Sequence, residues 1–99
     1  MKRTDIPKPR KLLSEFSSPL GNETLSVRIY RDRETFLCER RLVERDGTSF
    51  TMVLPFMEPQ AARVFLSADP YYSQVQREVK QVLVRLDRAW YRVNGKALT

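Results

Sequence analysis

Hydrophobic and polar residues alternate along three segments in the middle of the chain. In residues 24–31, Leu25, Val27 and Ile29 alternate with polar or partly polar side chains, and comparable runs cover residues 36–44 and 49–56. A period of two is typical of strands that bury one face and expose the other. The pattern therefore predicts three consecutive strands, which short connections join into an antiparallel meander.

The turn Arg45-Asp46-Gly47 fixes the register of the second and third strands. A two-residue turn would place charged residues on the apolar face, whereas a three-residue loop with left-handed Gly47 pairs Glu44 with Thr48 and Leu42 with Phe50. We therefore predict a bulged hairpin. Its shared apolar face contains Phe36, Cys38, Leu42, Phe50, Met52, Leu54 and Phe56.

One charge, Arg40, interrupts this apolar face. A long basic side chain can lay its aliphatic stem along apolar surface and keep its head in water. We expect Arg40 to reach solvent at the edge of the sheet in this way. Cys38 reads as a small core residue.

An apolar stripe at alternating spacings of three and four predicts a helix over residues 70–93. Asp69-Pro70 suits its start and Asn94-Gly95 a left-handed stop. A helix of this length exceeds the reach of its strands, so we expect part of the stripe to overhang. The candidate interface on that overhang consists of Val79, Val82, Leu86, Trp90 and Val93.

The segment 62–67 allows two interpretations, because Val64-Phe65-Leu66 favours a fourth strand whereas Ala61 and Ala62 favour a short helix. We prefer the strand. Prolines and turn-forming residues punctuate the N-terminal region, so residues 1–22 are expected to be a flexible basic tail and residues 23–99 one domain. The expected fold is α+β: a three- or four-stranded antiparallel meander packed on one long C-terminal helix.

The chain carries a formal net charge of +6, concentrated at its ends. Residues 1–11 contain five basic residues and one acidic residue, and residues 85–99 contain four and one. Basic clusters of this kind suit contacts with phosphates, and an exposed tyrosine between arginines suits stacking on bases. The candidate nucleic-acid-binding residues are Lys2, Arg3, Lys8, Arg10, Lys11, Arg28, Tyr30, Arg41, Arg85, Arg88, Arg92 and Lys96.

The inventory of reactive residues argues against an enzyme. The chain has no histidine, one cysteine and three isolated glycines, which excludes histidine-dependent triads, cysteine-based zinc clusters and glycine-rich phosphate loops. We expect no catalytic residues, no metal and no cofactor. The sequence has neither the apolar run of a signal peptide nor one long enough to span a membrane. A single cysteine allows no intramolecular disulfide, so we expect a cytoplasmic protein.

The order of antiparallel strands followed by one long helix resembles the layout of Pur, Whirly and transcriptional-coactivator single-strand binders. The run ETFLCERRLVERDGTSFTMVLPF, with DPYYSQVQREV after it, resembles small uncharacterised proteins of Burkholderia-type proteobacteria. The layout and the charge together imply a small binding module for DNA or RNA. The alternative is a homodimeric protein-interaction module that pairs through the helix stripe.

Overall fold

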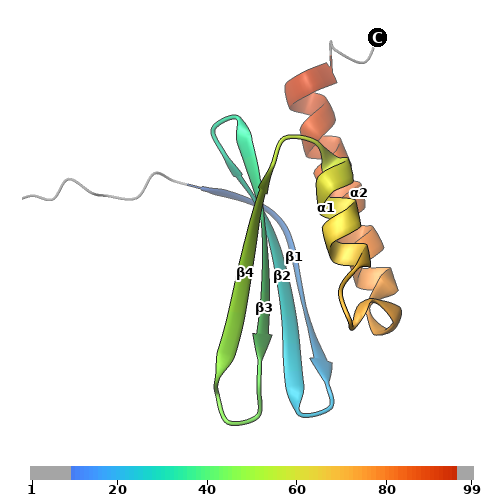
Figure 1. The fold of residues 1–99 in the computed structure, drawn as a ribbon. Helices are drawn as coiled ribbons and strands as arrows, with labels where there is room; N and C mark the ends of the chain where they lie inside the picture. The colour runs from blue at the N-terminus through green and yellow to red at the C-terminus, as the bar shows by residue number, and fades with distance from the viewer. Residues whose placement is uncertain (1–9, 96–99) are drawn as a thin grey trace, which may run out of the picture.

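The computed structural model describes residues 10–95, which form a four-stranded antiparallel sheet with two helices. The strands lie in the order β1-β2-β3-β4, so each one pairs with its neighbours in the sequence. Both helices lie on the same side of the sheet (Figure 1). The elements are β1 (Lys11–Leu20), β2 (Glu23–Asp32), β3 (Thr35–Val43), β4 (Ser49–Phe56), α1 (Pro59–Ser67), the 3-10 turn η1 (Tyr72–Gln74) and α2 (Gln76–Asn94).

The three strands predicted from the alternation are confirmed as β2, β3 and β4, and so is the register of their second hairpin. Leu42 pairs with Phe50. The Glu44 N–H donates to the Thr48 carbonyl at 2.7 Å, and Gly47 has a φ of +92°. The Asp46 carboxylate accepts the Thr48 N–H at 2.9 Å, which also lowers the pKa of Asp46. The three-residue loop therefore places the apolar residues of β3 and β4 on one face.

The predicted extent of the tail is wrong, because residues 11–20 form the edge strand β1. Gly21, at φ +67°, begins the tight turn that joins β1 to β2, a position where glycine has no steric penalty. Pro19 is tolerated because an edge strand leaves one row of backbone groups unpaired. A register shift between Leu12 and Ser14 breaks the alternation, which hid the strand in the sequence. Residues 1–9 lie outside the described residues.

The preferred strand at 62–67 is also wrong, since these residues belong to α1. Pro59 occupies the first turn of this helix, where its missing N–H donor costs nothing. Ala62 and Leu66 point into the core four residues apart, while Val64 stays on the surface. A run of three apolar residues does not distinguish the two periods, so the preference for a strand had little to support it.

The long helix begins six residues later than predicted, at Gln76, and ends at Asn94. Asp69 starts a turn instead of the helix, because its carboxylate accepts the Tyr71 N–H at 2.9 Å. At the other end, Gly95 has a φ of −54°, so the predicted left-handed stop is wrong. The buried stripe is confirmed and packs the helix on the sheet through Val79, Val82, Leu83 and Leu86.

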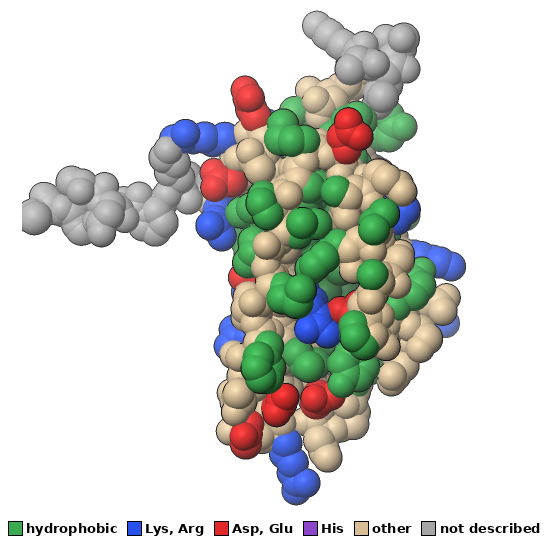
Figure 2. All heavy atoms as spheres, viewed as in Figure 1, with side chains coloured by type: hydrophobic (Ala, Val, Ile, Leu, Met, Phe, Trp, Pro, Cys, Tyr) green, Lys and Arg blue, Asp and Glu red, His purple; other side chains and the backbone are tan. Residues whose placement is uncertain are grey.

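The core lies between the helices and the centre of the sheet. Its sheet side contains Leu25, Val27, Ile29, Phe36, Cys38 and Phe56. Burial raises the pKa of the Cys38 thiol to about 12, so the thiol stays protonated at neutral pH. Helix α2 lies mainly against β1 and α1 lies beside β4. As a result Phe50 and Met52 remain exposed, and hydrophobic side chains gather on the surface over β4 and α1 (Figure 2).

The turn between β2 and β3 contains the one non-glycine residue with positive φ among residues 10–95, Arg33 at +62°. A side chain with a Cβ is strained in this region. We expect Arg33→Gly to raise the free energy of unfolding by about 0.5–1 kcal/mol in urea titrations. The neighbouring Glu34→Gly, at a residue without positive φ, serves as the control and should lower stability. Equal losses in both variants would contradict the strain.

Candidate functional site

Basic side chains from β1, β2 and α2 converge on one groove on the helix side of the sheet. Arg85, Arg88 and Arg92 follow one another at spacings of three and four, which places them on the same face of α2. Lys11 and Arg31 are direct cross-strand partners in β1 and β2. All five line a groove of about 390 Å³, here called the basic groove.

The remaining lining of the basic groove is aliphatic: Leu12, Leu13, Ala89 and Val93. Within residues 10–95, no carboxylate lies within ion-pair distance of the five cations. The Arg31 Nε–H donates to the Arg33 carbonyl at 2.8 Å, which leaves its remaining guanidinium donors available. Unneutralised cations around an apolar floor create a site that attracts an anion.

A second hollow of about 450 Å³ between β1 and α2 shares Arg85 and Arg88 with the basic groove. Its lining also includes Lys80, and the acidic residues Glu15 and Glu78. The positive surface therefore extends along α2 from the C-terminal half of the helix and ends where these carboxylates begin.

Three predicted site residues lie on the other face of the sheet, away from the helices. Arg28 stands between Glu15 and Glu39 in the cross-strand register, and its Nε lies 3.1 Å from a Glu15 oxygen. The Tyr30 hydroxyl and then Glu15 raise the pKa of Arg28. Because Glu15 neutralises this arginine and Glu39 is its partner on the other neighbouring strand, the outer face lacks the concentrated charge of the basic groove.

Tyr30 and Arg41 share this outer face with Arg28. The Arg10 guanidinium lies 6.0 Å from the centre of the Tyr30 ring and 3.9 Å from Asp32. Arg41 donates to the Ser49 hydroxyl at 3.5 Å. The predicted binding residues thus divide between two faces, with Lys11, Arg85, Arg88 and Arg92 in the basic groove. Lys2, Arg3, Lys8 and Lys96 lie outside the described residues.

The predicted helix interface is used inside the chain. Val79, Val82 and Leu86 are buried against the sheet, so they offer no accessible surface to a partner. The Trp90 Nε1–H donates to the Met57 carbonyl at 2.8 Å, and Val93 lines the basic groove. Most of the predicted overhang is therefore covered, because β1 extends the sheet under α2. Val93, near the C-terminal end of the stripe, stays 39% exposed.

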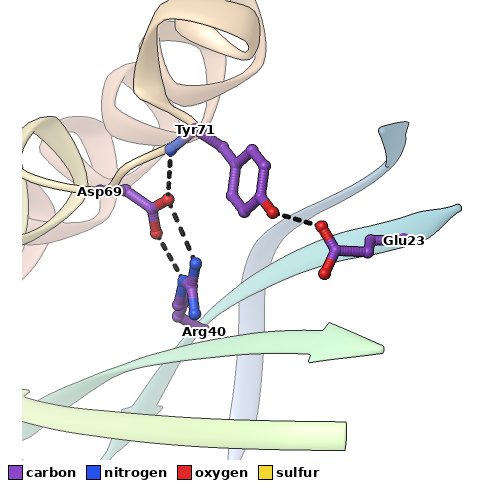
Figure 3. Close-up of polar contacts among 4 residues, drawn as sticks. All are labelled: Glu23, Arg40, Asp69 and Tyr71. Carbon is purple, nitrogen blue, oxygen red and sulfur yellow. Dashed lines mark hydrogen bonds and ion pairs between the residues drawn. The ribbon is translucent and has the colours of Figure 1, made fainter. Parts of the chain in front are cut away.

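A partly buried polar cluster joins the sheet to the connection between the helices (Figure 3). Arg40 does not extend to solvent as predicted: it is 9% exposed and forms two hydrogen bonds with Asp69, at 2.5 and 3.2 Å. The Asp69 carboxylate also accepts the Tyr71 N–H, and the Tyr71 hydroxyl donates to Glu23 on β2. The cluster therefore links β2, β3 and the segment between α1 and α2.

Its chemistry is that of a structural tether. Hydrogen bonding to Glu23 raises the pKa of Tyr71, so the phenol remains a donor rather than a base. The Arg40 and Asp69 charges compensate each other, which is the condition for burying both. Within the part of the chain that the structure describes, no three potential metal ligands lie together.

The sequence did not lead us to predict the roles of Arg31 in the basic groove and of Asp69 in the polar cluster. Arg31 is separated from Leu25, Val27 and Ile29 by even numbers of residues along β2, so its side chain lies on the same face of the sheet as theirs. This spacing in the sequence could have placed Arg31 on the helix side. Asp69 was read as a helix cap. The signal for the role of Asp69 was Arg40, because a single charge on an apolar face needs a partner of opposite charge when it is buried.

Comparison of the chain with protein-family models, curated proteins and solved structures gave no match. Among residues 10–95, neither helix has the length and the apolar character needed to cross a membrane.

Removing one partner of the buried pair should be costly. We expect Asp69→Ala to lower the free energy of unfolding by about 3–5 kcal/mol, because it leaves the Arg40 guanidinium buried and unpaired. Chemical denaturation followed by circular dichroism measures the change.

The pair Arg63–Asp87 provides a matched control, since its nitrogen and oxygen lie 3.3 Å apart but both side chains are more than one-third exposed. Asp87→Ala should therefore cost less than about 1 kcal/mol. If the two alanine variants lose the same stability, burial does not distinguish the pairs and the tether has no special role.

Proposed function

We propose that this chain is a non-enzymatic nucleic-acid-binding module that holds a sugar-phosphate backbone in the basic groove. The observation that carries the proposal is the convergence of Lys11, Arg31, Arg85, Arg88 and Arg92 on one groove, with no neutralising carboxylate among the described residues. Guanidinium groups offer paired donors that match phosphate oxygens.

The size of the groove favours one strand over a duplex. A volume of about 390 Å³ is that of a small-molecule site, so the groove fits the backbone of one strand and not a double helix. The long side chains of the five cations around it can each contact a different phosphate of that strand. The aliphatic floor faces the sugars. Since no aromatic residue among residues 10–95 lines this groove, contact is made mainly with phosphates, and binding should depend little on base sequence.

The same lining supports a binding role rather than catalysis. Cations and aliphatic groups hold an anion but provide no general base or nucleophile that is active near neutral pH. The N-terminal segment adds further cations, because Lys2, Arg3 and Lys8 precede the groove residue Lys11 in the sequence. Each further phosphate contact made by this segment would steepen the salt dependence.

Fluorescence anisotropy with labelled 20-nucleotide DNA and RNA tests the proposal. Five phosphate contacts to a single strand predict a log–log salt slope near −3.5, or about a 100-fold loss of affinity between 50 and 200 mM salt. Replacing Arg85, Arg88 and Arg92 together with glutamine should weaken binding at least tenfold and reduce the slope by about 2.

A triple variant of Arg28, Arg41 and Arg45 to glutamine provides the control, because it removes the same net charge from residues outside the basic groove. Its affinity should stay within about threefold of the wild type. No binding of the wild type at 50 mM salt would overturn the proposal. Equal losses in both triple variants would show that net charge alone causes the binding.

A further inference from the structure

We infer that a second copy of this chain docks on the exposed apolar surface over β4 and α1, so that the protein is a twofold homodimer. This surface, here called the open apolar face, consists of Phe50, Met52 and Leu54 of β4 with Val64 and Phe65 of α1. It lies away from the basic groove, which β1, β2 and α2 form. The inference therefore stands independently of the proposed function.

The open apolar face leaves several large hydrophobic side chains in water. Phe50, Met52 and Val64 are 54%, 51% and 58% exposed. Two adjoining hollows of about 370 and 600 Å³ share Val64 and Phe65, and their linings are mostly apolar. Figure 2 shows hydrophobic side chains gathered on the surface over β4 and α1.

The area matches what a dimer needs. Large apolar side chains that are half exposed, taken with the partly exposed Leu54 and Phe65, give on the order of 400 Å² of apolar surface per copy. Two copies, with a polar rim, therefore bury about 1,000 Å², the size at which specific interfaces begin.

The charges on this face favour a second copy over a nucleic acid. Arg40 and Asp69 line the first hollow and neutralise each other through their ion pair. The second hollow adds the Glu58 carboxylate, so the face carries no excess positive charge. On a chain with a net charge of +6, two copies that meet through this face avoid bringing their excess positive charges together. Among residues 10–95, no unpaired cation lines the two hollows, so a polyanion finds no partner in this part of the chain.

The face is also self-complementary in its two halves. The apolar residues at the start of β4 lack a covering helix, and α1 exposes Val64 on the side that does not face its own core. A twofold rotation can bring the helix half of each copy onto the strand half of the other, as an isologous contact requires. Each copy then supplies the layer that the other lacks.

The two edge strands of the sheet also support a contact on the β4 side. Edge strand β1 carries Lys11, Glu15, Pro19 and a register shift, which are features that discourage pairing with another chain. Edge strand β4 contains no charged residue, and its only such feature is Pro55. The open apolar face therefore continues onto the less protected edge of the sheet.

Sedimentation equilibrium of the nucleic-acid-free full chain, from 1 to 100 µM, tests the inference. The wild type should reach twice the chain mass of 11.7 kDa. Met52→Glu and Val64→Glu should each weaken dimerisation at least tenfold, because both place a charge in the apolar contact. Circular dichroism should show that both variants keep the wild-type fold.

Val53→Glu is the matched control, since Val53 lies on the same strand with 51% exposure but points to the opposite face of the sheet. This variant should dimerise like the wild type. A wild type that stays monomeric at 100 µM overturns the inference and leaves the face to a different protein. A dimer that survives both glutamates in folded variants, or that Val53→Glu disrupts equally, overturns it as well.

Discussion

The buried ion pair between Arg40 and Asp69 is the constraint on which the arrangement of the helices depends. It fixes the connection between α1 and α2 to the middle of β3, and Tyr71 extends the same tether to Glu23 on β2. Because each charge is costly to bury without the other, the connection cannot move along the sheet without losing stability. With the connection held there, α2 lies against β1 and the start of β4 remains uncovered.

This arrangement separates two kinds of surface. On the side of β1, the packing of α2 brings three arginines toward Lys11 and Arg31, which lie in different strands. On the side of β4, the lack of a covering helix leaves apolar residues exposed around a neutralised ion pair. Dimerisation through the open apolar face would leave both basic grooves accessible, and two linked grooves bind a long polyanion more tightly than one groove alone.

Much of the sheet could be predicted from the sequence, because a buried face imposes strict alternation and a one-residue slip would expose it. Strand β1 was not predicted, because a register shift between Leu12 and Ser14 and the proline at position 19 both disturb the alternation. Helix α1 was misread because three adjacent apolar residues fit either period. Among the site residues, helical spacing correctly grouped Arg85, Arg88 and Arg92. Arg28 lies on the outer face as predicted, but its ion pair with Glu15 could not be predicted, because it depends on pairing with the unrecognised strand.

The central claim is that nucleic acid binds to the helix side of the sheet, in the basic groove. Following the arginine Nε–H signals by NMR during titration with an unlabelled 20-nucleotide strand tests this claim residue by residue. The account predicts that the signals of Arg31, Arg85, Arg88 and Arg92 shift together, while those of Arg28, Arg41 and Arg45 stay in place. Larger shifts on the outer face, or unchanged groove signals at saturation, would contradict it.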